Sequence, residues 1–232
     1  MNIILTGGAG YIGSNVALKI LDNGHNVTIL DNLITGNKNL IPKKAEFFNT
    51  DIANEKFISD IISKTSYDLA IHFAGLINVE ESIKDPKKYD LFNYEKAKIF
   101  FQTCMKNNLK KFIFSSTAGV YGKNKEHKAI KEDSLINPLN PYAESKHKLE
   151  KFLLNLADNK KASCIILRYF NVAGADVKLR SGLAAKETNN IIKILCELVT
   201  KKRKKIIING NNYDTTDGTP VRDFIHINDL SE

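Results

Sequence analysis

The feature that most constrains the fold is a glycine-rich turn near the start of the chain. The turn has the sequence Gly7-Gly8-Ala9-Gly10-Tyr11-Ile12-Gly13, and it follows the apolar run Asn2-Ile3-Ile4-Leu5-Thr6. Glycines allow the backbone to approach a phosphate closely, and the N-terminus of a following helix offers unpaired N–H groups and a partial positive charge. A strand before the turn and a helix after it are the context that a dinucleotide-binding turn requires. The sequence therefore predicts a pyrophosphate site formed by Gly7, Gly10, Tyr11, Ile12 and Gly13.

The chain up to residue 171 alternates short β-type runs with helical stretches, a pattern typical of a parallel sheet covered by helices. We expect a doubly wound, Rossmann-like α/β fold. The predicted strands are 2–6, 26–30, 46–49, 69–73, 111–114 and 163–167, and the predicted helices begin near Tyr11 or span 87–107 and 142–157.

The pattern changes after Asn171. A loop rich in small and polar residues is expected at 172–188, a helix at 189–200, a short strand at 206–209 and a β-like stretch at 222–227 with Asn228 as a helix N-cap. We expect two domains: residues 1–171 bind the dinucleotide, and residues 172–232 form part of a smaller substrate-binding domain that ends before it is complete.

The second predicted strand ends at Asp31. A carboxylate at this place can accept hydrogen bonds from the adenosine ribose hydroxyls and would repel a 2′-phosphate. No arginine follows within Asp31-Asn32-Leu33 to bind such a phosphate, so the sequence favours NAD over NADP. The alternative is an ordinary turn aspartate. Asp51 and Ile52 follow the third strand, and we expect them at the adenine edge.

A second pair of residues indicates the chemistry. Tyr142 and Lys146 are four positions apart and would share one face of a helix. A free tyrosine titrates near pH ~10, and a nearby ammonium group and a positive nicotinamide ring would both lower its pKa. The fifth strand runs into Ser115-Ser116-Thr117, where a hydroxyl could hydrogen-bond the oxygen being oxidised. Chance alone also produces this spacing in helices, but the combination predicts hydride transfer at an alcohol carbon.

Composition adds few constraints. The formal net charge is +8, with the densest basic run at 201–205, which is typical of a solvated helix end rather than of a nucleic-acid site. The three cysteines lie far apart without the spacing of metal ligands. No apolar run is long enough to cross a bilayer, and a strand begins at once without a leader peptide. We therefore expect a cytoplasmic protein without a metal, a membrane contact or a nucleic-acid partner.

Five motifs occur in an order that resembles the extended short-chain dehydrogenases/reductases and, among them, the UDP-glucose 4-epimerases. The resemblance covers essentially the whole chain. The motifs are the glycine turn, His72-Phe73-Ala74-Gly75-Leu76, Ser115-Ser116-Thr117-Ala118-Gly119-Val120-Tyr121-Gly122, Tyr142-Ala143-Glu144-Ser145-Lys146 and Leu167-Arg168-Tyr169-Phe170-Asn171, followed by Asn189-Asn190-Ile191 and a segment that begins at Asp217 and contains Arg222.

This resemblance implies NAD-dependent 4-epimerisation of UDP-glucose and UDP-galactose through a transient 4-keto sugar. Tyr142 would be the base, Thr117 would bind the 4′-oxygen, and Lys146 would also bind the nicotinamide ribose. It also implies further cofactor contacts, a UDP site and a possible homodimer. The implied cofactor contacts are Asn32, Phe73, Ala74, Gly75, Ser115 and Tyr169, and the implied UDP contacts are Asn171, Asn190, Ile191 and Arg222.

The chain also departs from the family pattern. Ile77 stands where the family often has a lysine that contacts the cofactor, and Phe92 replaces the first of two paired asparagines. Family members continue well past Glu232, so we expect the remaining part of the substrate cap to be missing.

Two alternatives stay open: a UDP-N-acetylglucosamine 4-epimerase, and a truncated, inactive NAD-binding remnant. A dehydratase is disfavoured, because Ala118 and Gly119 stand where elimination of water needs an extra acid and base.

Overall fold

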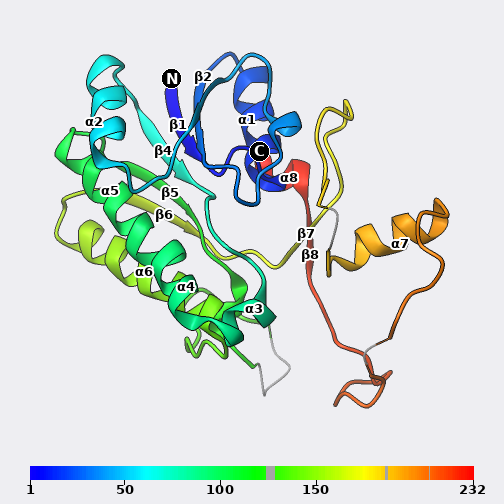
Figure 1. The fold of residues 1–232 in the computed structure, drawn as a ribbon. Helices are drawn as coiled ribbons and strands as arrows, with labels where there is room; N and C mark the ends of the chain where they lie inside the picture. The colour runs from blue at the N-terminus through cyan, green and yellow to red at the C-terminus, as the bar shows by residue number, and fades with distance from the viewer. Residues whose placement is uncertain (124–128, 186–187, 209) are drawn as a thin grey trace.

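The computed structural model describes residues 1–123, 129–185, 188–208 and 210–232. Its centre is a six-stranded, all-parallel sheet in the order β3-β2-β1-β4-β5-β6 (Figure 1). This order confirms the predicted doubly wound fold. The strands are β1 (Asn2–Thr6), β2 (Asn26–Asp31), β3 (Glu46–Asn49), β4 (Leu69–His72), β5 (Lys111–Ser115) and β6 (Ser163–Leu167).

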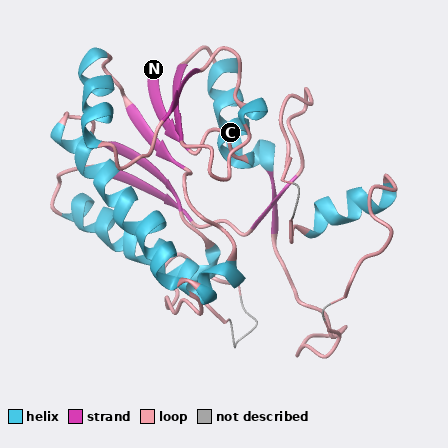
Figure 2. Ribbon diagram, in the orientation of Figure 1, coloured by secondary structure: helices cyan, strands magenta, loops and turns pink. Residues whose placement is uncertain are grey.

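Helices cover both faces of the sheet, as Figure 2 shows. Alternating residues of β1 point to opposite faces: Ile4 belongs to one apolar core, and Ile3 and Leu5 belong to the other. The first core includes side chains of α2, α5 and α6, and the second includes side chains of α1. The helices are α1 (Tyr11–Asp22), α2 (Glu55–Lys64), α3 (Val79–Lys84), α4 (Pro86–Asp90), α5 (Lys96–Lys106) and α6 (Pro141–Asp158).

The helix predicted at 87–107 is interrupted. A π-helical turn, η2 (Leu91–Glu95), joins α4 to α5. Asn93 is buried in this turn and binds Leu76 twice: its Oδ1 accepts from the Leu76 N–H at 2.7 Å, and its Nδ2 donates to the Leu76 carbonyl at 3.0 Å. The turn therefore fixes the segment that follows β4, and π-helical turns of this kind are frequent at functional sites.

The part of the chain after residue 170 has a small parallel sheet of β7 (Asn171–Ala173) and β8 (Phe224–His226), with the helices α7 (Ile191–Val199) and α8 (Ile227–Ser231). The strand predicted at 206–209 is wrong for 206–208, which are exposed loop, because no described strand lies beside them to pair with. Residue 209, like 186–187 of the predicted loop, lies outside the described residues. His226 rather than Asn228 caps α8, since its Nδ1 accepts from the Asn228 N–H at 3.2 Å.

The last helix of the described chain, α8, lies beside the first helix, α1. Helix α8 packs against α1, and Lys19 of α1 pairs with Glu232 at 2.5 Å. In the described ranges, none of the helices combines the length and the apolar character that crossing a bilayer needs.

Candidate functional site

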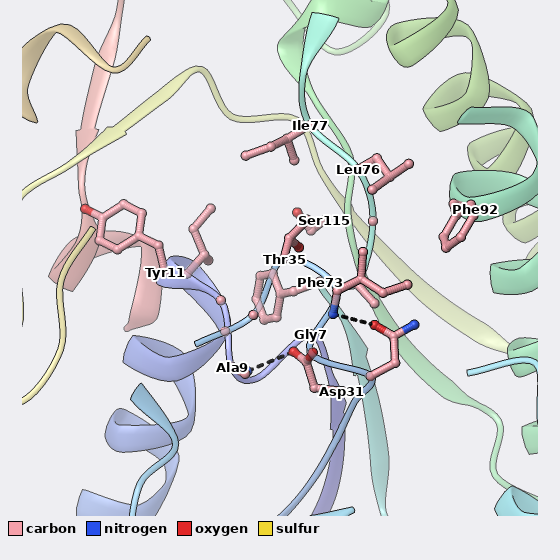
Figure 3. A pocket seen from close by; sticks show the side chains of 18 of the residues that line it. Gly7, Ala9, Tyr11, Asp31, Thr35, Phe73, Leu76, Ile77, Phe92 and Ser115 are labelled. Atoms are coloured by element: carbon pink, nitrogen blue, oxygen red, sulfur yellow. Dashed lines mark hydrogen bonds between the residues drawn. The ribbon is translucent and has the colours of Figure 1, made fainter. Parts of the chain in front are cut away.

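A cavity of about 550 Å³ lies at the carboxyl ends of the central strands, beside the point where β1 and β4 meet (Figure 3). This is where open α/β sheets bind ligands, and the volume is ordinary for a small-molecule site. All the residues that the sequence indicates as catalytic or cofactor-binding line this cavity. They are Gly7, Gly10, Tyr11, Ile12, Gly13, Asp31, Asn32, Asp51, Ile52, Phe73, Ala74, Gly75, Ser115, Thr117, Tyr142, Lys146 and Tyr169.

The backbone packing of the glycine turn leaves no room for a side chain at Gly7 or Gly13. Gly7 has φ +75°, and a Cβ there would lie 2.5 Å from the Ala74 nitrogen. A Cβ at Gly13 would lie 2.3 Å from the Gly7 carbonyl oxygen. Helix α1 begins directly after Gly10, which has no side chain to cap the first N–H groups. The positive end of α1 therefore lies in the cavity wall, which suits an anionic ligand.

Asp31 fixes the other side of the turn. Its side chain accepts hydrogen bonds from the Ala9 N–H at 3.0 Å and from the Leu33 N–H at 2.8 Å (Figure 3 shows the Ala9 bond). A carboxylate offers about four acceptor positions, so the group retains capacity for a ligand hydroxyl. The described lining contains no arginine, a composition that suits NAD better than NADP.

The catalytic candidates come from two elements. Helix α6 begins at Pro141 after the cap Asn140, and this start places Tyr142 and Lys146 one turn apart. Thr117 follows β5, and its side chain lies close enough to Tyr142 to lower the pKa of the phenol. The Lys146 ammonium donates to the Ser115 carbonyl at 3.0 Å. The fold thus brings the predicted hydroxyl, phenol and amine to one end of the cavity.

The electrostatics of this set correct one expectation. Burial raises the pKa of Tyr142, and the nearby Thr117 hydroxyl opposes that shift only in part. Burial also lowers the pKa of Lys146 to about 8, with the Glu150 carboxylate acting in the opposite direction. Lys146 is not among the groups that shift the Tyr142 pKa here, so burial of the phenol dominates and the protein groups do not produce the predicted lowering.

Two further aromatic residues surround Tyr142. Tyr169 forms a hydrogen bond between its hydroxyl and that of Ser115, and burial raises the pKa of Tyr169. The ring of Tyr89 lies edge-on to the ring of Tyr142, with centroids 6.5 Å apart. The Tyr89 ring therefore packs against the Tyr142 ring without adding charge.

The residues that the resemblance assigns to UDP lie outside the cavity lining. Asn171 donates to the Asp223 carbonyl at 3.0 Å, and Asn190 donates to the Val172 carbonyl at 3.0 Å. Ile191 is exposed at the start of α7, and the exposed Arg222 donates only to the neighbouring Val221 carbonyl among the described residues. These contacts bring Asn171, Asn190 and Arg222 to the small β7–β8 sheet.

The cavity also has walls that the sequence interpretation missed. Thr35, Gly36 and Asn37 follow Asp31, and a Cβ on Gly36 would lie 2.8 Å from the Asp31 carboxylate. A short polar turn with a glycine directly after the acidic strand end was the signal that could have found them. Phe92 and Lys96 from the η2–α5 junction and residues 183–185 also line the cavity. Of these, only Phe92 was noted in the sequence, as a departure from the family pattern.

The doubly wound sheet, the glycine turn and the Tyr-x-x-x-Lys helix together are typical of short-chain dehydrogenases/reductases. Residues 3–232 match the family described as "NAD dependent epimerase/dehydratase family", and the chain belongs to this family.

Curated relatives narrow the comparison to the UDP-glucose 4-epimerases. The chain is 37% identical over 230 residues to that of Azospirillum brasilense and 39% identical over 233 residues to that of Lacticaseibacillus casei. These alignments cover 99% and 100% of this chain, but only 66% and 70% of the relatives. The chain therefore spans about two thirds of the length of these relatives.

Solved structures agree with this placement. A UDP-glucose 4-epimerase is similar with a TM-score of 0.94 and 35% identity, covering 100% of this chain and 70% of its own. The enzyme from Stenotrophomonas maltophila, solved with NAD and formylated UDP-arabinopyranose, has a TM-score of 0.93 and 30% identity and covers 100% of this chain and 71% of its own. The UDP-Glc/GlcNAc 4-epimerase from Campylobacter jejuni has a TM-score of 0.82 and 37% identity and covers 99% of this chain and 71% of its own.

Proposed function

We propose that this chain catalyses the NAD-dependent 4-epimerisation of UDP-glucose and UDP-galactose, an isomerisation through a transient 4-keto sugar. One observation carries the proposal. Tyr142, Lys146 and Thr117 lie at one end of a cavity whose other part is formed by the glycine turn and Asp31. A proton-transferring set and a dinucleotide site in one cavity are what such a reaction needs.

The residues present fit NAD. The start of α1 would hold the pyrophosphate, Asp31 the adenosine ribose, and Lys146 the nicotinamide ribose. Bound NAD would supply a reversible hydride acceptor beside the sugar.

The protein residues would then move and hold the proton. Tyr142 would take the proton from the 4′-hydroxyl as the C4′–H bond breaks, and it would return that proton once hydride has come back to the opposite face. Thr117 would hold the 4′-oxygen by a hydrogen bond in both half-reactions. Because burial raises the pKa of Tyr142, the positive charges around it must favour the phenolate for this step.

The UDP group is proposed to lie toward the β7–β8 sheet. Asn171, Asn190, Ile191 and Arg222 are the proposed contacts, and an arginine opposite a diphosphate is chemically suitable. The division into domains at residues 171 and 172, a cytoplasmic location and a homodimer are retained as predictions.

Conversion of UDP-galactose to UDP-glucose by the purified chain with NAD is the direct test. Tyr142→Phe keeps the ring and removes the proton-transferring oxygen, so turnover should fall by about 100-fold or more. NAD binding without turnover in the unchanged chain would contradict the proposed activity and support an inactive NAD-binding protein. Faster turnover of UDP-N-acetylglucosamine would favour the second candidate, which the likeness to the Campylobacter jejuni enzyme supports.

A further inference from the structure

The proposed reaction assigns a role to some charged side chains of the cavity wall but not to Lys96. The described lining contains four charged side chains, which are Asp31, Asp51, Lys96 and Lys146. Lys146 lies at the Tyr142 end, where its ammonium donates to the Ser115 carbonyl. NAD carries two negative phosphates, and the opposite end of the cavity already holds two carboxylates. Lys96 is therefore the one described cation in the lining that can offset this negative charge.

The geometry of Lys96 is defined by two contacts. It is the first residue of α5, and its Nζ lies 2.5 Å from Oδ2 of Asp51. The same nitrogen lies 4.2 Å from the centre of the Phe92 ring, a cation–π arrangement. Only 21% of the Lys96 side chain is exposed, so solvent screens the pair less than it screens surface pairs. The α5 start, the end of β3 and the η2 turn thus meet at this ammonium.

The pKa of Asp51 depends on the Lys96 ammonium. Burial alone would raise the pKa of Asp51, but the hydrogen bonds from Lys96 and the Ala53 N–H bring it below its usual value. The carboxylate is therefore ionised, and its Oδ1 is fixed by the Ala53 N–H at 2.9 Å. Without Lys96, an unpaired negative charge would face an anionic ligand in a partly buried wall.

We propose that Lys96 is a cofactor-binding residue that positions Asp51 and neutralises the adenosine end of the cavity. This inference rests on the proposed binding of NAD and does not require epimerisation. The positive charge of Lys96 explains how the pocket accommodates two carboxylates and a diphosphate. Ile77 cannot supply that charge, although the family often has a lysine at its position. Phe92 contributes by stacking under the ammonium and limiting its movement.

The test compares dissociation constants, measured by calorimetry, for NAD, ADP-ribose and nicotinamide mononucleotide. Lys96→Met should weaken NAD and ADP-ribose by about tenfold and change nicotinamide mononucleotide by less than about twofold. Lys96→Arg should keep the dissociation constants for NAD and ADP-ribose within about threefold of the unmodified protein, since the charge remains. Adding Asp51→Asn to Lys96→Met should restore part of the lost affinity, because the unpaired carboxylate is removed.

Lys106→Met is the matched control. Lys106 lies at the other end of α5, and it pairs with Glu55 on the exposed surface at 3.1 Å. This control should leave all three affinities unchanged. An unchanged ADP-ribose affinity in Lys96→Met, or an equal loss for nicotinamide mononucleotide, would overturn the inference. A chain that binds NAD but does not epimerise refutes only the proposed activity, whereas an unmodified chain that binds neither NAD nor ADP-ribose refutes both proposals.

Discussion

Arg168 binds the fully buried carboxylate of Glu150 through two nitrogens, with Nε 3.0 Å from Oε1 and Nη2 2.8 Å from Oε2. Glu150 lies one helical turn after Lys146 on α6, and its Oε1 also accepts from the Ser116 hydroxyl. The remaining Nη1 of Arg168 donates to the Tyr121 hydroxyl at 3.0 Å. One ion pair therefore joins the helix that carries the base to the ends of β5 and β6.

Arg168→Met should destabilise the protein by about 3 to 5 kcal/mol, because it removes the guanidinium that balances the buried carboxylate of Glu150. The free energy of unfolding in urea measures this effect. The double variant Arg168→Met with Glu150→Met should recover part of the loss, since neither charge remains. Lys106→Met, which breaks an exposed pair, should cost less than about 1 kcal/mol. If Arg168→Met lowered the free energy of unfolding as little as Lys106→Met does, the stabilising role assigned to the Arg168–Glu150 pair would be contradicted.

Lys146→Met should change the pH dependence of stability. The pKa of Lys146 in the folded protein is about 8, below its ordinary value, so the unfolded chain binds more protons between pH 8 and about 10.4. Wild-type stability relative to the variant should therefore rise with pH across that window. Below about pH 8 the difference should be constant. Urea unfolding of both proteins from pH 7 to 10 measures it, and parallel curves would show that Lys146 titrates normally.

His72 should make the protein sensitive to acid. It is fully buried, its Nδ1 lies 2.7 Å from the Thr6 hydroxyl, and burial together with the Lys146 charge lowers its pKa to about 3. The unfolded chain therefore binds more protons between pH ~6.5 and 3, so stability falls as the pH falls through this range. His72→Phe should flatten this part of the curve. His25→Gln is the control, because His25 is only half-buried. An equal flattening of the stability curve in this control would refute the role assigned to His72.

Gly13→Ala tests the glycine turn. Alanine normally favours a helix over glycine by about 1 kcal/mol, yet a Cβ at this position would lie 2.3 Å from the Gly7 carbonyl oxygen. We expect lower thermal stability and weaker NAD binding. Gly182→Ala is a suitable comparison, because its Cβ would meet only the Ala175 Cβ at 3.4 Å. Unchanged NAD affinity in Gly13→Ala would show that the close approach is not needed.

The sheet was predictable because each strand is a short apolar run with its own flanking turns. Runs such as 2–6 and 163–167 pair with neighbouring strands that the same parallel pattern supplies. The run 206–208 has the same composition, but it has no described strand beside it. Composition alone does not reveal whether a partner strand exists, so this prediction failed.

The cavity wall was predictable where a local motif carries the chemistry, as in the glycine turn and the α6 pair. Lys96 was not predictable, because its contact with Asp51 joins residues 45 positions apart on different elements. The π-helical turn before it also shifts the register of the helix, and a regular 3.6-residue period does not include such an insertion.

The pairing of Lys19 with Glu232 places the last residue of this chain on the helix that begins at the glycine turn. A fluorophore coupled to position 232 would therefore sense the environment of α1. Ligand binding at the start of that helix would then be followed by fluorescence without altering any cavity side chain.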